Sequence, residues 1–271
     1  MERLGTRLPY RWLSEPCPVG AADRPSNSSW LRRPSDPCPP PPAPGTTPAE
    51  LLRDQGYAIL TRAATIAKCR QAVQSLRTAS WDTKGLPSYE ATDGKARHDT
   101  RRQQTTANKA IWITNLTTVL TEGLDEAGLM HCTSGKKTVV RLHGLKSLQT
   151  NRYDTRAAPE VQQDGDQAPH MDEGEARYNE WVLAHTDPSD APMSVMLAIM
   201  PGTRLRVFAN GRWQILEPAV GDIVVFRGNV LHNGMGYPAE HLRIHAYLYP
   251  PGYNHPSEVE FQETPTGPGA S

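Results

Sequence analysis

From about residue 137, the sequence is a series of short apolar segments, each closed by turn residues. The candidate strands, in chain order, are KTVVRLHGL, SLQTNRY, APHMD, MSVMLAIM, LRVFA, WQILE, DIVVFRG, VLHNG and LRIHAYLY. Turn sequences such as PGT, ANGRW, PAVGD and GYPAE stand between them, and the Asn-Gly of ANGRW accepts the positive φ angles of a type I′ hairpin. Many short strands at regular spacing predict a sandwich or small barrel with helices packed outside, a mainly β protein of the α+β class.

The residues before this region predict a helical support. A first helix is expected over PAELLRDQ, because Thr47 can cap it, Pro48 suits its first turn and Gly56 can end it. A short strand, YAIL, follows. The next segment, TIAKCRQAVQSLRTAS, predicts an amphipathic helix whose apolar face consists of Ile66, Cys69, Val73 and Leu76.

Two polar stretches, 82–106 and 174–192, are expected to be loops at the mouth of the barrel. Between the first of them and the β region, apolar residues recur within 108–129 and predict another helix that ends near Gly128. The predicted organisation is therefore a Pro-rich head at 1–47, a helical support at 48–130, a β core at 131–252 and a flexible tail at 253–271. The head, which contains PSDPCPPPPAPGTTP, has too few apolar residues to offset its ordering entropy, so it is expected to be disordered.

Charge and composition limit the kinds of binding partner and the cellular compartments that are expected. The sequence has 29 basic and 29 acidic residues, which disfavours nucleic acid as a partner, and no apolar run suits a membrane span. The basic residues 95–102 are expected to be a solvated loop. The four cysteines form no C-x-x-C pair, and no secretory signal is evident, so a cytoplasmic or nuclear location is expected. Organelle targeting by the head stays an alternative, because the head contains arginine and serine.

Three side chains are candidates for one metal site. In QAPHMDEG, His170 and Asp172 are two positions apart, so on a strand they would project from the same face, about 6.6 Å apart. His232, in GDIVVFRGNVLHNGMGY, follows a Gly-Asp turn and an apolar strand, and is the third candidate. Two histidines and one carboxylate form the facial triad of non-haem Fe(II) oxygenases, which leaves positions open for O₂ and a cosubstrate.

Arg243 is the fourth candidate residue of the site. Alternation along LRIHAYLY places Arg243, His245 and Tyr247 on one face and the apolar residues on the other. A guanidinium that points into a pocket needs an anion, and its planar fork matches a carboxylate. A hairpin that joins the strand of His232 to that of Arg243 would bring the arginine near the metal.

At these residues the chain resembles the Fe(II)/2-oxoglutarate-dependent dioxygenase superfamily, phytanoyl-CoA/prolyl-hydroxylase-like in the broad sense. The family pattern of H-x-D, a distal histidine and an arginine roughly ten residues later corresponds to His170-Met-Asp172, His232 and Arg243, over about residues 137–250. The resemblance implies a double-stranded β-helix, the jelly-roll or cupin-like barrel. It also implies that the first three residues bind Fe(II) and that Arg243 binds the C5 carboxylate of 2-oxoglutarate, with Tyr153 as a further contact to this cosubstrate.

The activity that this resemblance implies is hydroxylation of a C–H bond, with consumption of O₂ and 2-oxoglutarate, release of succinate and CO₂, and ascorbate as an optional reductant. The substrate, a small molecule or a macromolecule, is not indicated, and no oligomeric state follows from the sequence. The alternative is a non-enzymatic cupin-like binding barrel. Gln167 and Asn233 flank the ligands and either orient them or are structural. His245 is expected to be a satisfied barrel histidine, and structural or solvated roles are expected of His143, His185 and His241.

Overall fold

The fold rests on two antiparallel sheets that face each other, as a computed structural model shows. The structure describes residues 45–82, 86–88, 97–99, 101–106, 111–130, 132–133, 136–137, 139–150, 154, 156–159, 161–163, 165–173, 175–184 and 191–253. All helices and strands among them lie in the unit that runs from Thr47 to Ser271. The predicted head and nearly all of the predicted tail lie outside the described residues, and the predicted domain boundaries stay predictions.

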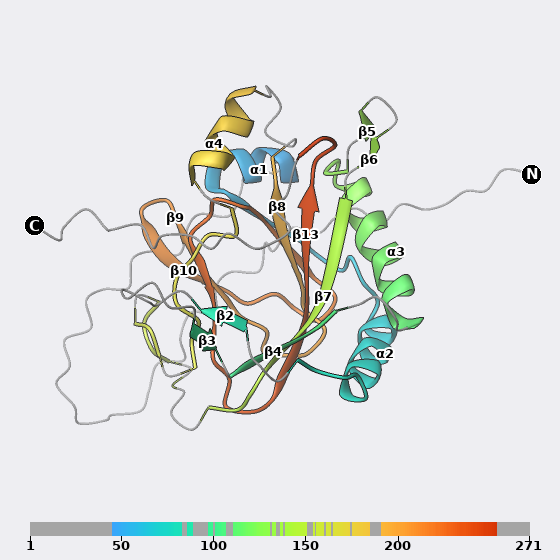
Figure 1. Cartoon of the computed structure of the whole chain (residues 1–271), viewed down its shortest axis with the longest axis vertical. Helices are drawn as coiled ribbons and strands as arrows, with labels where there is room; N and C mark the ends of the chain where they lie inside the picture. The colour runs from blue at the N-terminus through green and yellow to red at the C-terminus, as the bar shows by residue number, and fades with distance from the viewer. Residues whose placement is uncertain are drawn as a thin grey trace, which may run out of the picture. The chain divides into compact units, whose positions relative to one another are not determined.

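The larger sheet has six strands in the order β1-β11-β8-β13-β7-β4, and all its pairings are antiparallel (Figure 1). These strands are β1 (Tyr57–Leu60), β4 (Arg102–Thr106), β7 (Val139–Ser147), β8 (Met193–Leu197), β11 (Ile223–Arg227) and β13 (His241–Tyr249). The smaller sheet, ordered β10-β9-β12, comprises β9 (Leu205–Ala209), β10 (Arg212–Leu216) and β12 (His232–Gly234). Neighbours in the larger sheet that are distant in sequence, such as β1 and β11, produce the crossed connections of a jelly roll.

The remaining elements are short or lie outside the sheets. Two further antiparallel pairs are β2 (Leu86–Ser88) with β3 (Arg97–Asp99), and β5 (Cys132–Thr133) with β6 (Lys136–Lys137). The helices are α1 (Pro48–Gln55), α2 (Ile66–Arg77), α3 (Ile111–Glu126) and α4 (Glu175–Ala184). None of these four helices combines the length and the apolar character that a membrane span requires.

Helix α2 covers the outer face of the larger sheet. Its neighbour is α3, and α3 lies along β7 (Figure 1). Leu76 of α2 is fully buried and lies so close to Gly144 of β7 that a Cβ built on this glycine would be 2.6 Å from Leu76 Cδ2. Because side chains alternate along a strand, His143 and Leu145 on either side of Gly144 point the other way, into the barrel.

An apolar cluster fills part of the barrel interior, between the two sheets. It includes Met196 and Phe226 from the larger sheet and Leu205 and Val207 from the smaller one. Met196, Leu205 and Phe226 also line the cavity described below, so the apolar core forms one wall of the site.

The helical support forms largely as predicted. The side chain of Thr47 accepts a hydrogen bond from Glu50 N, and the Glu50 carboxylate accepts one from Thr47 N, which completes a capping box. Gly56 ends the helix in the left-handed conformation, with φ of 85°. On α2 the buried residues are Cys69, Ala72 and Leu76, whereas Ile66, expected on the buried face, is 49% exposed because it begins the helix.

The capping box gives a stability prediction. Thr47→Ala removes the acceptor for Glu50 N and is expected to lower the free energy of unfolding by about 1 kcal/mol. Chemical denaturation of the two proteins measures this difference. Thr47→Ser keeps the hydroxyl and serves as the control, with a stability close to that of the natural protein; equal losses in both variants would contradict a role for the cap.

Four local predictions are wrong. The stretch 82–106 is not all loop, because β4 hydrogen-bonds to β7 as a polar edge strand, RQQTT, that has no apolar alternation. The stretch 174–192 contains α4. In SLQTNRY the strand ends at Ser147, and only Gln149 forms an isolated bridge; residues 151–153 lie outside the described part. APHMD is not a strand either: only His170 forms a bridge, with His232.

Candidate metal centre

His170, Asp172 and His232 lie together, with ligand atoms within 4.8 Å of one another. The Nε2 atoms of His170 and His232 are 3.8 and 3.6 Å from carboxylate oxygens of Asp172. His232 lies on β12, and His170 is held beside it by two backbone hydrogen bonds, His170 N to His232 O (2.9 Å) and His232 N to His170 O (2.8 Å). A two-residue bridge thus brings the ligands together, in place of the regular strand that the sequence predicts.

Both imidazoles are held in the tautomer that a metal requires. His170 Nδ1 donates to Ala168 O at 2.8 Å, and His232 Nδ1 donates to Val230 O at 2.9 Å. A carbonyl oxygen only accepts, so in the neutral form of each ring the proton is on Nδ1 and the lone pair is on Nε2. Each Nε2 faces Asp172 and is therefore the atom that can bind a metal ion.

The charge states also suit metal binding. Burial, and then the neighbouring His232, lower the pKa of His170 to about 4, so this imidazole is neutral near pH 7. Burial alone would raise the pKa of Asp172, but the nearby histidines His232, His245 and His170 and the Ser194 hydroxyl hold it below its usual range. The Ser194 hydroxyl donates a hydrogen bond to Asp172 Oδ2. The centre therefore offers the neutral imidazole of His170, the imidazole of His232 and one carboxylate.

The three ligands line a cavity of about 220 Å³ between the sheets. Arg243, His245 and Tyr247 of β13 also line it, which agrees with the alternation predicted along LRIHAYLY. Arg243 does not arrive through a hairpin with the strand of His232, however. Strand β12 pairs with β9 in the smaller sheet, while β13 pairs with β7 and β8 in the larger one, so the arginine faces β12 across the barrel.

Arg243 has the properties expected of an anion anchor. It is 4% exposed, and its Nη1 has no hydrogen-bond partner among the residues that the structure describes. Its guanidinium lies against Gly234, where a Cβ would be 2.4 Å from Arg243 Nη2, so a side chain at this position would displace the guanidinium. A buried cationic donor without a partner is costly, and a carboxylate in the cavity would satisfy it.

Other polar side chains form a second wall of the cavity, and the sequence did not assign them to the site. His245 Nε2 is 3.8 Å from Asp172 Oδ2, and burial lowers the pKa of His245 to about 3, so its ring is neutral. His143, expected to be structural or solvated, lines the cavity next to Gln104, and Tyr247 packs edge-on against both His143 and His245. Alternation along β7 and β13 is the sequence signal for His143, His245 and Tyr247, whereas Gln104 lies on β4, which the sequence did not predict.

The other sequence candidates have varied outcomes. Gln167 lines the cavity, with its amide nitrogen 3.4 Å from His170 Nε2, and Asn233 lies behind the ligands. His241 stacks on Tyr237 and hydrogen-bonds to Thr203, which agrees with a structural role. Tyr153 and His185 lie outside the described residues.

Comparison with known proteins supports the fold. No protein-family model matches the sequence, and no curated protein matches it. Among solved structures, HygX from Streptomyces hygroscopicus with nickel and 2-oxoglutarate bound shares 8% sequence identity, with a TM-score of 0.51 over 76% of this chain and 87% of that one. A prolyl hydroxylase from Trichoplax adhaerens, in complex with a hypoxia inducible factor peptide fragment, shares 10%, with a TM-score of 0.50 over 75% and 87%. The chain thus has a double-stranded β-helix fold like that of these two structures, and the predicted fold class is confirmed.

Proposed function

We propose that the protein is an Fe(II)- and 2-oxoglutarate-dependent dioxygenase that hydroxylates a C–H bond of its substrate. The observation that carries this proposal is that a His-Asp-His triad and a buried arginine with an unsatisfied donor share one cavity. Two imidazoles and one carboxylate fit Fe(II) and leave coordination positions open. The unsatisfied guanidinium fits the distal carboxylate of a 2-oxo diacid.

In this proposal, His170, Asp172 and His232 hold the ferrous ion, and Arg243 orients 2-oxoglutarate through its C5 carboxylate. The bound ion would activate O₂, the oxidant, and 2-oxoglutarate would supply two electrons as it decarboxylates: one oxygen atom of O₂ would enter the product, and the other would enter succinate as CO₂ is released. Tyr153 is retained as a candidate contact to the cosubstrate, and ascorbate as an optional reductant. Met196, Leu205 and Phe226 give the cavity an apolar wall that limits access of bulk water.

The polar wall of Gln104, His143, His245 and Tyr247 is the surface that we assign to the substrate. It lies beside Asp172 and offers hydrogen-bonding groups without a carboxylate, lysine or arginine, so it suits a polar, uncharged part of a substrate. HygX has also been solved with hygromycin B bound, and the Trichoplax enzyme with a peptide fragment, so both small molecules and peptides are substrate candidates by analogy.

The test is cosubstrate binding in the absence of O₂. Under anaerobic conditions the full chain with Fe(II) is expected to develop a weak visible charge-transfer band as 2-oxoglutarate is added, because the keto acid chelates the ion with two atoms. Succinate, which has no keto group, is the control ligand and should give no band. Absence of the band in the folded, Fe(II)-loaded protein would favour the non-enzymatic binding barrel.

A further inference from the structure

The segment that carries His170 and Asp172 has no regular secondary structure, yet it must hold two ligands in place. Its backbone is tied to the smaller sheet at two points: Gln167 N donates to Gly234 O at 2.8 Å, and His170 bridges to His232. A short segment with so few backbone links depends on side chains to fix its position.

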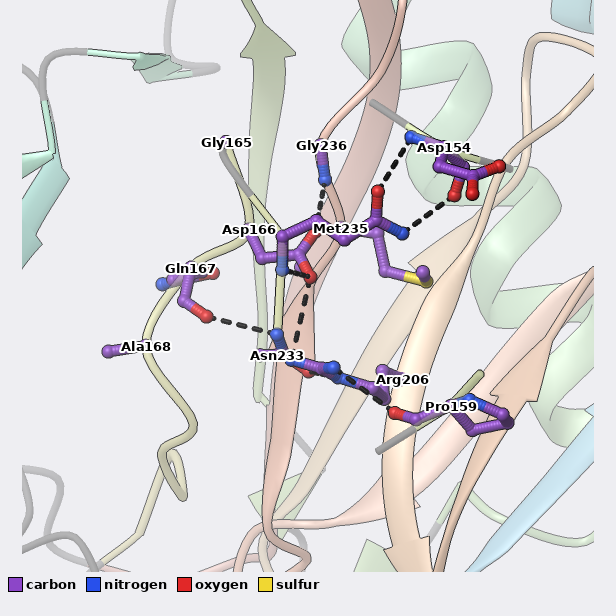
Figure 2. A network of polar contacts seen from close by, with 12 residues as sticks. Asp154, Pro159, Gly165, Asp166, Gln167, Ala168, Arg206, Asn233, Met235 and Gly236 are labelled. Atoms are coloured by element: carbon purple, nitrogen blue, oxygen red, sulfur yellow. Dashed lines mark hydrogen bonds and ion pairs between the residues drawn. The ribbon is translucent and has the colours of Figure 1, made fainter. Parts of the chain in front are cut away.

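Those side chains form a buried cluster behind the site, which consists of Asp166, Arg206 and Asn233 and which we call the clamp. Arg206 of β9 donates through Nε to Asn233 Oδ1 at 2.7 Å, and its Nη2 is 3.5 Å from Asp166 Oδ2. A guanidinium only donates, so the Asn233 oxygen faces Arg206 and the amide Nδ2 donates to Gln167 O at 3.0 Å. Figure 2 shows Asn233 between Arg206 and Gln167, with Asp166 above them.

Asp166 ties the segment to the residues that follow β12. Its carboxylate accepts a hydrogen bond from Gly236 N at 2.7 Å (Figure 2). It accepts another from Gln163 N at 3.0 Å. Arg206 also donates to Pro159 O at 3.1 Å. The clamp therefore connects the chain before His170 with both β9 and β12, the strand that carries His232.

The clamp is fully removed from solvent, since the side chains of Asp166 and Arg206 are 0% and 2% exposed and Asn233 is 0% exposed. Burial of an ion pair adds little net stability relative to a well-packed apolar core. The advantage of the clamp is geometric, because charged, directional hydrogen bonds permit only one placement of the ligand-carrying segment relative to β12.

We propose that Asp166, Arg206 and Asn233 are positioning residues that set the distance between the His170–Asp172 pair and His232. The clamp also fixes Gln167, whose carbonyl accepts from Asn233 and whose side chain lines the cavity. None of the three clamp residues supplies a metal ligand, so they act on metal binding by holding the segment that carries His170 and Asp172 in place. This inference rests on the proposed function, in that it takes the triad to be a metal site.

The test measures Mn(II) affinity by electron paramagnetic resonance, and the thermal midpoint of unfolding, for the full chain and four variants. Asp166→Asn and Asn233→Ala are expected to weaken Mn(II) binding by about 10- to 100-fold, the range for residues that orient metal ligands. The double variant should bind Mn(II) no more weakly than the single variant with the lower affinity, because both substitutions disable the same clamp. Glu217→Gln is the matched control: it removes an exposed carboxylate that pairs at 2.8 Å with Arg204, directly before β9, and should leave Mn(II) affinity unchanged.

The outcomes separate this inference from the proposed function. If the natural chain binds Mn(II) and the folded Asp166→Asn and Asn233→Ala variants bind it equally tightly, the positioning role of the clamp is wrong. The assignment of the metal site is then unaffected. Absence of Mn(II) binding by the natural chain would overturn both. Asn233→Ala creates no unpaired buried charge, so it decides the matter if Asp166→Asn does not fold.

Discussion

Asp172→Ala is expected to abolish 2-oxoglutarate turnover and to weaken Fe(II) binding by more than about 100-fold, because loss of residues that merely orient ligands already costs about 10–100-fold. The variant removes the single carboxylate of the triad and leaves two imidazoles, which are insufficient for a facial set. Succinate formation, followed by mass spectrometry, and anaerobic Fe(II) titration measure the two effects.

The fold should survive this substitution. The His170 imidazole is neutral, and both histidines keep the hydrogen bond from Nδ1 to a backbone carbonyl, while the Ser194 hydroxyl loses its acceptor. The thermal midpoint is therefore expected to change far less than the turnover. Glu217→Gln again controls for loss of an unrelated carboxylate. Undiminished succinate formation in Asp172→Ala would defeat the assignment of this residue as a ligand.

The parts of the fold that could be predicted from sequence are those that local chemistry determines. The Asn210-Gly211 turn, with φ of 54° and 75°, joins β9 to β10 as ANGRW predicts. Alternation along β13 correctly placed Arg243, His245 and Tyr247 in the barrel, because one face of this strand lines the cavity and the other is apolar.

The parts that could not be predicted depend on long-range pairing. Strand β4 is polar and is a strand only because β7 offers it an edge, so its sequence contains no apolar period. The predicted hairpin between the strands of His232 and Arg243 is wrong for a similar reason: adjacency in sequence favours a hairpin, but β12 and β13 lie in different sheets. The triad was found despite this error, since the residue types identified it independently of the strand partners.

The clamp could not be predicted either. Asp166 and Arg206 are forty positions apart and carry charges that, in most sequences, would lie at the surface. Asn233 was noted only because it follows His232. Only the fold shows that the three side chains meet behind the ligands.

Arg243→Ala is expected to weaken the binding of 2-oxoglutarate without lowering the stability of the protein. Loss of a hydrogen bond to a charged group costs about 1.5–3 kcal/mol, so the half-saturation concentration of 2-oxoglutarate should rise by about 10- to 100-fold. The protein without cosubstrate should be at least as stable as before, because the substitution removes a buried guanidinium whose Nη1 has no partner among the described residues. A merely structural arginine would give the reverse result, lower stability with unchanged half-saturation.

Two controls make this prediction specific to the distal carboxylate. Arg243→Lys keeps the charge but loses the planar fork, so its half-saturation should lie between those of the natural protein and the alanine variant. 2-Oxopentanoate has the keto acid but no distal carboxylate, so the natural protein should strongly prefer 2-oxoglutarate over it, and Arg243→Ala should lose most of that preference. The guanidinium reaches from β13 across the cavity to Gly234 of β12, the strand that carries His232, so Arg243 and the triad are placed to hold the two ends of one cosubstrate. An unchanged preference in Arg243→Ala would place the distal carboxylate elsewhere in the cavity.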